Sequence, residues 1–320
     1  MISSRKYLLK SVLFAVPILF LWSWMEFKLS NIPNSYSEKS RILHENIQNI
    51  DFIALGSSQA LYSVNPECFH LKGLNLANVS QSYSFDWFLL NEILNKKNKI
   101  SFLFLPVSYF SFGYDLADSP EIWRIYFYYH YFQLHSPEID HWDSRCYSEV
   151  MRYGFKTALT SSIQSKSNDL IAQMNVYGWI ARHSSVPNTL ISEESGKKRV
   201  ELHHSLLNYS NRKKNIQYLE NIFNLCNQHH VKVILFEPPV WKTYQKFQKA
   251  EIEESNDSLI NYLKGKYSFH FIPASEFQSL ELSDFYDNDH VNPSGARKIS
   301  FKLSNLADSL LTVKNRYFAK

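Results

Sequence analysis

The stretch Ala54-Leu-Gly-Ser-Ser-Gln59 closes a short apolar run, Ile50 to Leu55, that has the composition of a buried β-strand. A strand that ends in Gly-Ser-Ser and then enters a helix can present a serine hydroxyl at the rim of a sheet. This motif is therefore the first candidate for a functional residue, and it predicts that the domain begins with a strand followed closely by a helix.

A second polar block stands near the other end of the chain. Asp287-Asn-Asp-His290 is followed by Asn292-Pro-Ser-Gly295, where a proline in the first turn predicts the start of the last helix. A serine nucleophile needs a general base, and the base needs a group that orients it. His290 would be the base and Asp287, one helical turn earlier, the orienting group. Asp289 ranks second for that role.

The composition permits one large domain or two small ones and excludes some classes of protein. The chain has 320 residues, of which 45% are hydrophobic. The formal charge of +4 is small and scattered, so we expect no nucleic-acid partner. Cys68, Cys146 and Cys226 lack a metal-binding spacing. They are predicted to be free thiols, with one disulfide bridge as the alternative. We expect no cofactor.

The N-terminal segment predicts a membrane anchor. Two basic residues precede a stretch from Tyr7 to Met25 that is almost entirely apolar, and its length matches the ~20 residues that cross a bilayer. Trp22 and Trp24 suit the membrane interface, and no small-residue cleavage site follows. We expect residues 1–28 to be a cytoplasmic stub and an uncleaved signal anchor, with the domain extracytoplasmic. A cleaved signal peptide and a buried first helix are the alternatives.

Beyond a polar segment at 29–49, predicted to be a linker, apolar runs alternate with amphipathic stretches over residues 50–320. Strands are predicted at 50–55, 100–107, 231–236 and 269–272, and helices at 83–96, 211–227, 243–264 and from Pro293 onward. Short apolar strands between amphipathic helices indicate an α/β fold of three layers, with a parallel sheet covered on both faces. Ligands of such sheets bind beyond the carboxyl ends of the strands, where the Gly-Ser-Ser motif is expected.

Residues 110–205 interrupt this alternation and are predicted to form an insertion or cap. The segment Glu121–Phe132 is rich in aromatic residues and is predicted to be helical. Aromatic faces can stack on sugar rings, so the cap could face a carbohydrate. The rings could instead form the core of the cap, and this second interpretation is favoured.

The two polar blocks together resemble the first and last blocks of the SGNH (GDSL-like) hydrolase superfamily. In that family a Gly-Asp-Ser block follows the first strand and carries the nucleophile. Gly56-Ser57-Ser58 fits this block with serine in place of the aspartate. The resemblance therefore implies Ser58 as the nucleophile, Asp287 and His290 as its partners, and an SGNH- or flavodoxin-like sheet. The Gly-Ser-Ser form is similar to a membrane-anchored branch that includes the teichoic-acid D-alanylation proteins.

The central blocks depart from the family pattern, which has an oxyanion-hole glycine after the second strand and an asparagine after the third. A backbone N–H can serve as donor whatever the side chain, so Ser80 or Gln81 would replace the glycine. Ser108 or Asn78 would supply the remaining donor. Loss of one such donor lowers rates by roughly 10²–10³. The departure therefore leaves hydrolysis and acyl transfer from an activated donor both open.

Two further roles are suggested by local sequence. Trp241 and Tyr244 follow a predicted strand on the active edge and could contact the substrate, although loop packing is an equal alternative. Asp287, Asp289 and His290 could together bind a metal. No further cysteine, histidine or glutamate stands close by, so no metal site is predicted.

The sequence thus predicts an extracytoplasmic serine esterase or O-acyltransferase that modifies a cell-envelope polysaccharide through an acyl-enzyme on Ser58. The expected partners are the polysaccharide or its acyl donor, the membrane and, by the resemblance, a membrane-bound O-acyltransferase. The alternative is a non-catalytic, membrane-anchored assembly or glycan-binding protein that keeps the fold with a degenerate site.

Overall fold

The computed structural model describes residues 2–96, 99–164, 169–183 and 191–318. At the centre of these described residues lies a parallel sheet of five strands in the order β2-β1-β3-β4-β5. The strands are β1 (Phe52–Ala54), β2 (Gly73–Asn75), β3 (Phe102–Pro106), β4 (Lys232–Phe236) and β5 (His270–Ile272). The predicted strands β1, β3, β4 and β5 are confirmed, whereas β2 was not predicted.

The strand order has a reversal point at β1. Ala54 pairs with Asn75 of β2 on one side and with Phe104 of β3 on the other, so the chain winds in opposite directions from this strand. Doubly wound sheets bind their ligands at such a point, beyond the carboxyl ends of the strands. The Gly-Ser-Ser motif directly follows β1 and therefore lies at this point.

Helices cover both faces of the sheet, which confirms the predicted three layers. Along each strand successive side chains enter different cores: Ile53 packs in the core under α4 and α10, whereas Phe52 and Ala54 pack in the core under α3 and α13. The first face carries α4 (Tyr83–Asn95), α10 (Asn211–Gln228) and α12 (Ala250–Lys266), and the second carries α3 (Ser58–Ser63) and α13 (Pro293–Phe318). A short helix, α11 (Lys242–Gln245), precedes α12.

The prediction of a linker at 29–49 is wrong. Residues Ser35–Asn46 form α2, which begins at an Asn34 capping box. Ile42 and Leu43 of α2 are buried in the first core, and Lys39 is fully buried and donates to the carbonyl oxygen of Ala77. The segment looks polar in sequence because Arg41, His44 and Glu45 lie on its exposed face, yet its few apolar residues suffice to dock it.

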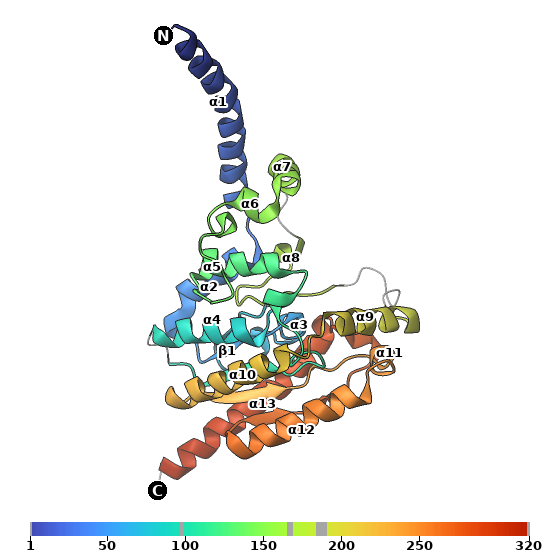
Figure 1. The fold of residues 1–320 in the computed structure, drawn as a ribbon. Helices are drawn as coiled ribbons and strands as arrows, with labels where there is room; N and C mark the ends of the chain where they lie inside the picture. Colours follow the sequence, from blue (N-terminus) through green and yellow to red (C-terminus); the bar gives the residue numbers. More distant parts are fainter. Residues whose placement is uncertain (1, 97–98, 165–168, 184–190, 319–320) are drawn as a thin grey trace.

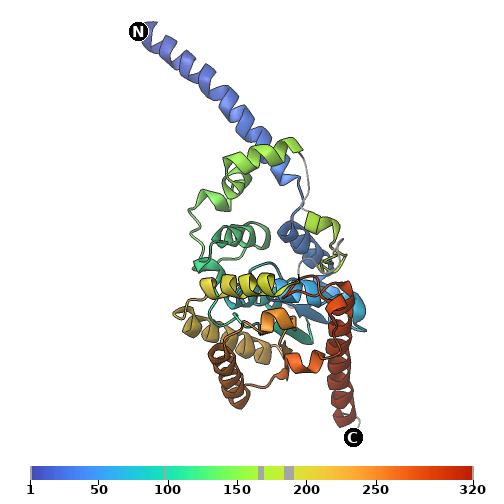
Figure 2. The ribbon, with the colours of Figure 1, turned by 90° about the vertical axis from the view of Figure 1, so that its right-hand side faces the viewer.

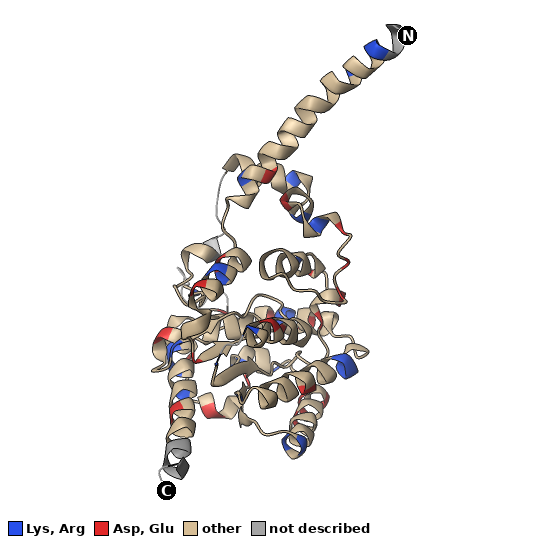
Figure 3. Cartoon of the chain, turned by 90° about the vertical axis from the view of Figure 1, so that its left-hand side faces the viewer, with Lys and Arg blue, Asp and Glu red and all other residues tan. Residues whose placement is uncertain are grey.

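Helix α1 (Ile2–Ser30) projects away from the rest of the molecule (Figures 1 and 2). It is long and apolar enough to cross a membrane, and only 6% of its most apolar window is buried. Figure 3 shows the middle of α1 without charged residues, and the sequence has none from Ser11 to Met25. One end of α1 therefore has the character of a membrane span and the other meets the domain.

The C-terminal end of α1 packs on a pair of helices, α6 (Glu149–Tyr153) and α7 (Phe155–Gln164). We call α6 and α7 the collar. Met25 and Leu29 of α1 are buried against Val150 and Ala158 of the collar. The base of α1 is thus held by side-chain packing and is not a free tether.

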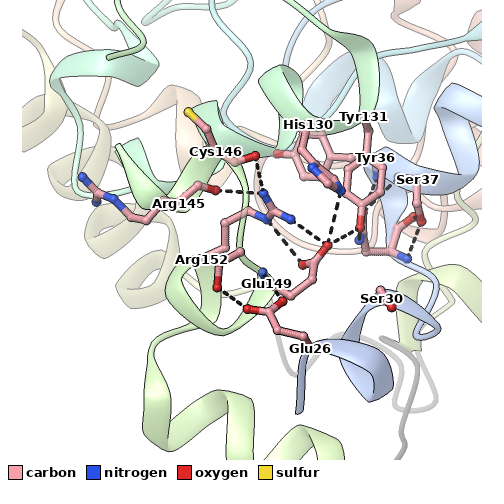
Figure 4. A network of polar contacts seen from close by, with 12 residues as sticks. Glu26, Ser30, Tyr36, Ser37, His130, Tyr131, Arg145, Cys146, Glu149 and Arg152 are labelled. Atoms are coloured by element: carbon pink, nitrogen blue, oxygen red, sulfur yellow. Dashed lines mark hydrogen bonds and ion pairs between the residues drawn. The ribbon is translucent and has the colours of Figure 1, made fainter. Parts of the chain in front are cut away.

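A buried polar network reinforces this junction (Figure 4). Glu26 accepts hydrogen bonds from the hydroxyl of Ser148 and from the backbone N–H of Glu149 at 2.8 Å, at the start of α6, where a negative charge is favoured. Glu149 in turn pairs with Arg152 at 2.7 Å, and both side chains are almost wholly buried. Tyr131 donates to Glu149 at 3.0 Å, so the network joins α1 and the collar to the aromatic segment of the insertion.

The aromatic segment of the insertion is largely core. Helix α5 (Ile125–Phe132) follows a 3₁₀ turn at Ile122–Arg124, so the predicted helix starts later than expected. Tyr126, Phe127, Tyr128 and Phe132 are buried, which supports the core interpretation over a sugar-stacking face for these rings. The insertion continues through the collar and α8 (Asp169–Ala172) to α9 (Glu193–Leu206).

Candidate active site

The Gly-Ser-Ser motif makes a tight turn from β1 into α3. Gly56 has φ +111, and a Cβ there would lie 2.4 Å from the ring of Pro106, so a side chain would fit neither the backbone conformation nor the space. The carbonyl oxygen of Ser57 accepts the backbone N–H groups of Ala60 and Leu61, both at 3.0 Å. Ser58 is therefore the first residue of α3, and its position is set by the backbone.

Folding brings the three predicted catalytic residues into one hydrogen-bonded chain. Ser58 Oγ lies 2.8 Å from His290 Nε2, across 232 residues of sequence. The other ring nitrogen, Nδ1, lies 3.0 Å from both carboxylate oxygens of Asp287. Such distances allow a serine–histidine–carboxylate relay, in which Nδ1–H donates to Asp287 and Nε2 accepts the serine proton.

The loop that carries His290 is held rigidly. Asp287 Oδ1 accepts the backbone N–H of His290 at 2.8 Å and that of Asp289 at 3.0 Å. An antiparallel bridge between Phe285 and Val291 closes the loop. The side chain of Asn292 then accepts two backbone N–H groups in the first turn of α13, which is the usual role of an N-cap. The imidazole is thus oriented before any ligand binds.

The electrostatics of the three groups suit general-base catalysis. Burial opposes the charge on Asp287, but the charge and hydrogen bond of His290 and the N–H of Asp289 outweigh it and lower the Asp287 pKa. Burial alone would lower the pKa of His290, yet Asp289 and Asp287 together raise it. Asp287 therefore stays ionised and stabilises the imidazolium that forms when His290 takes a proton.

Asp289 is a second carboxylate beside the base, 3.6 Å from His290 Nδ1. It is buried, and Arg199 of α9 donates to it at 2.9 Å. Burial raises the pKa of Asp289, although His290 and Arg199 act in the opposite direction. Because Arg199 binds Asp289 and Asp287 binds the imidazole, the preference for Asp287 as the orienting group agrees with the geometry.

The same three residues also have a spacing that a metal could use. Asp287, Asp289 and His290 each offer a ligand atom, and these atoms lie within 4.8 Å of one another. In this structure they contact one another, Arg199 and Ser58. Those contacts match a proton relay, because His290 turns its other nitrogen to a serine hydroxyl.

The two residues expected to replace the oxyanion glycine differ in what they can offer. Ser80 lines the cavity next to Ser58, but its hydroxyl donates to Glu121. The amide of Gln81 donates to Asp86 at 2.6 Å and accepts from Tyr128 at 2.7 Å. Burial raises the pKa of Asp86, and hydrogen bonds from Gln81 and Gly56 oppose this effect; the net pKa is about 7. The Gln81 side chain therefore supports the turn, and the backbone N–H of Gln81, the group expected to act as donor, binds the carbonyl oxygen of Asn78 at 3.2 Å.

Of the other two expected donors, only one lies by the motif. The backbone N–H of Asn78 donates to the carbonyl oxygen of Gly56 at 3.1 Å, and its buried side-chain Nδ2 has no hydrogen-bond partner among the described residues. Ser108 also has an unpartnered, buried hydroxyl, but it lines a different cavity, beside Glu237 and α12. Asn78 is therefore the better candidate, and the expectation for Ser108 is not supported.

Sequence reasoning missed Ser57. Its hydroxyl is buried, lines the same cavity as Ser58, and has no hydrogen-bond partner in the described part of the chain. A buried hydroxyl without a partner is costly, unless a ligand supplies one. The signal was present in the motif itself, where the family has an aspartate.

The expected substrate contact of Tyr244 is wrong. Its side chain is fully buried, and its hydroxyl is paired with His203 Nδ1. Trp241 is half-buried and packs on Phe285 with ring centroids 5.3 Å apart. Neither residue lines the cavity at Ser58, so loop packing, the alternative interpretation, accounts for both.

A cavity of about 280 Å³ opens beside Ser58. Its walls come from the loop after β2, the loop after β3 and helix α9. No role for α9 follows from the sequence alone. Four residues of α9 face it at helical spacing: Arg199, Leu202, His203 and Leu206. The insertion thus covers the carboxyl end of the sheet and completes the site.

Comparison with known proteins adds no relative. No protein-family model matches this sequence, and no curated protein does so either. Any assignment of function therefore rests on the residues and their geometry.

Proposed function

We propose that this protein is a serine acyl hydrolase or O-acyltransferase with an SGNH-like site. The observation that carries the proposal is the continuous contact from Ser58 Oγ through His290 to Asp287. A serine in a turn, 2.8 Å from an oriented imidazole, is what nucleophilic catalysis requires. The position at the reversal point of the sheet supports it, because ligands bind there in this class of fold.

In the first half-reaction, Ser58 Oγ attacks an acyl carbonyl carbon while its proton passes to His290 Nε2. Asp287 holds the tautomer and stabilises the imidazolium. The tetrahedral intermediate carries its negative charge on the former carbonyl oxygen, where Ser57 Oγ–H and Asn78 Nδ2–H are candidate donors. The bond to the leaving group then breaks, and His290 returns its proton to that group. This leaves an acyl ester on Ser58.

In the second half-reaction, water or a sugar hydroxyl attacks the ester, and His290 takes its proton. The bond between the acyl carbon and Ser58 Oγ breaks, and the proton returns to Ser58. Water yields hydrolysis, and a sugar hydroxyl yields O-acylation. The resemblance to anchored SGNH proteins supports an envelope polysaccharide as the acyl acceptor. It also supports a membrane-bound O-acyltransferase as a partner protein.

The apolar α1 supports the proposed location. A helix of this kind, preceded by basic residues, favours a membrane span with its N-terminus in the cytoplasm. The catalytic domain would then act outside the cytoplasm, close to the membrane surface.

A fluorophosphonate probe tests the catalytic proposal. The full chain in detergent should be labelled at Ser58, as mapped by peptide mass spectrometry, because the probe reports an activated serine. The variant Ser58→Ala should lose all labelling, whereas Ser57→Ala should keep a measurable, slower reaction. Absence of labelling in the folded wild type would overturn the enzyme proposal and favour a non-catalytic glycan-binding or assembly role. Labelling at Ser57 would show that the nucleophile is wrongly assigned.

A further inference from the structure

The geometry points to an aliphatic acyl chain, longer than acetyl, as the group that the cavity beside Ser58 binds. This inference rests on the proposed function, because it concerns the acyl group that Ser58 would receive. The cavity measures about 280 Å³, roughly nine times the ~30 Å³ that a water molecule occupies in the liquid. An acetyl group has three heavy atoms and would leave most of this volume empty.

The wall formed by α9 combines apolar side chains with polar side chains that have hydrogen-bond partners in the protein. Leu202 and Leu206 face the cavity one helical turn apart, on the same face as Arg199 and His203. Arg199 binds Asp289 at 2.9 Å, and His203 pairs with Tyr244. Arg199 Nε and His203 Nδ1, one nitrogen of each polar side chain on this face, are thus bound to other protein groups.

The opposite wall has the same character. Val79 and Phe110 contribute apolar surface. Glu121 binds Arg124 at 2.7 Å and accepts from Ser80, while Ser119 donates to the carbonyl oxygen of Leu116 at 2.9 Å. A sugar would need donors and acceptors that it could satisfy on binding. Here Ser80, Glu121 and Ser119 already have hydrogen-bond partners within the protein, and the rest of this wall is largely apolar, which favours an apolar ligand over a carbohydrate.

Among the described residues of this cavity, an unpartnered polar group lies at the reactive serine. Ser57 Oγ is buried and lines the cavity next to Ser58. An ester presents one oxygen to be stabilised at the nucleophile and an apolar chain beyond it. The arrangement of one unsatisfied donor beside Ser58 and apolar walls farther out matches that chemical pattern.

First-turnover kinetics with p-nitrophenyl esters test the inference. The acylation rate, measured as kcat/KM for p-nitrophenol release, should rise about fourfold per added methylene from acetate through butyrate to hexanoate, which corresponds to ~0.8 kcal/mol per buried CH₂. Leu202 is 47% exposed, so Leu202→Trp should fold normally and fill the cavity. The variant should lower the ratio of kcat/KM for hexanoate to kcat/KM for acetate by roughly tenfold. Tyr262→Trp, on the exposed face of α12, is the matched control and should leave the ratio unchanged.

The outcomes separate this inference from the proposed function. Equal rates for all esters, a preference for acetate, or labelling of Ser58 without release from any ester would overturn the acyl-chain inference alone. Failure of both the fluorophosphonate and every ester to react would overturn the proposed function itself.

A different observation carries a second inference: we infer that the collar rests on the lipid surface beside α1. This inference assumes only that α1 spans a membrane. Apolar residues of α7 recur at Phe155, Ala158, Leu159 and Ile163, a helical spacing. Ala158 and Leu159 pack on α1, whereas Phe155 and Ile163 are 54% and 67% exposed. The apolar stripe is therefore wider than its contact with α1 requires.

The position of the collar identifies the lipid surface as what covers the rest of this stripe. Trp22 and Trp24 of α1 pack against the same cluster as the collar, and tryptophan marks the membrane interface. Glu26, which caps α6, must lie outside the hydrocarbon. The collar is thus fixed at the level where an amphipathic helix buries its apolar face among headgroups, and Figure 1 shows α7 beside the base of α1.

Spin-label accessibility in nanodiscs tests the second inference. Labels at Phe155→Cys and Ile163→Cys, in a Cys68→Ser background, should show a several-fold higher ratio of O₂ to Ni-complex collisions than a label at Tyr262→Cys on α12. The two remaining cysteines are buried. If the protein is inserted in the nanodisc and the labels at 155 and 163 show the same ratio of O₂ to Ni-complex collisions as the solvent-exposed label at 262, the collar inference is overturned. Release of the full chain from the membrane by alkaline carbonate would overturn the anchor itself.

Discussion

The variant Asp287→Asn should lower the acylation rate of Ser58 by about 10⁴-fold while leaving the fold intact. Asp287 accepts from His290 Nδ1 at 3.0 Å, and its charge raises the His290 pKa. An asparagine keeps the shape but loses the charge, and its amide can hold the imidazole in the wrong tautomer. The measurement is kcat/KM for p-nitrophenyl ester acylation, with circular dichroism to verify the fold.

Asp289→Asn is the matched control, because Asp289 also lies beside His290 but binds Arg199. We expect it to retain most of the rate. Removing this carboxylate takes away the larger of the two charges that raise the His290 pKa. His290 must be neutral to accept a proton, so activity falls as the pH drops through the His290 pKa. The variant has a lower His290 pKa, and the acid limb of its pH–rate profile should therefore shift to lower pH. If Asp289→Asn lost the rate and Asp287→Asn kept it, the two roles would be reversed.

The variant Arg152→Met should destabilise the junction between α1 and the domain by about 3–5 kcal/mol. Arg152 is completely buried, pairs with Glu149 at 2.7 Å, and donates to the carbonyl oxygen of Cys146 at 3.0 Å. Removing the cation leaves Glu149 buried without its partner. Hydrogen exchange of α6 and denaturant unfolding of the full chain in detergent would report the loss.

Arg145→Met is the surface counterpart, since the pair of Arg145 with Asp143 is partly exposed and should contribute about 0–1 kcal/mol. The double variant Arg152→Met with Glu149→Leu should recover part of the stability, because it removes both buried charges together. Unfolding of Arg152→Met at the wild-type denaturant concentration would show that the ion pair does not hold the junction.

Several elements could be predicted from sequence because their signals are local. The apolar runs at 100–107 and 231–236 carry strands β3 and β4, and the proline at position 293 starts α13. Strand β2 has three residues, Gly73–Asn75, too few to show an alternation. The sequence of helix α2 indicates a linker because most of its residues are polar, although Ile42 and Leu43 dock it to the core.

The candidate site shows the same division. Ser58, Asp287 and His290 could be selected because the residue types and their order are typical of one chemistry. The oxyanion donors could not be selected, because sequence does not show which backbone N–H groups stay free. In the fold the backbone N–H of Gln81 binds the carbonyl oxygen of Asn78. Arg199 stands in a run of charged residues that resembles a solvated helix, yet folding pairs it with Asp289.

The sequence by itself determined the alternation of strands and helices, the apolar N-terminal helix and the choice of Ser58, Asp287 and His290 as candidates. Each of these follows from residue type or from short-range periodicity. Tertiary structure alone decided that α9 covers Ser58, that Tyr244 is buried, and that α1 is held at its base. Those outcomes depend on the order of the strands and on which buried polar groups find each other. Such partners lie up to hundreds of residues apart, as Ser58 and His290 do, and no local pattern records them.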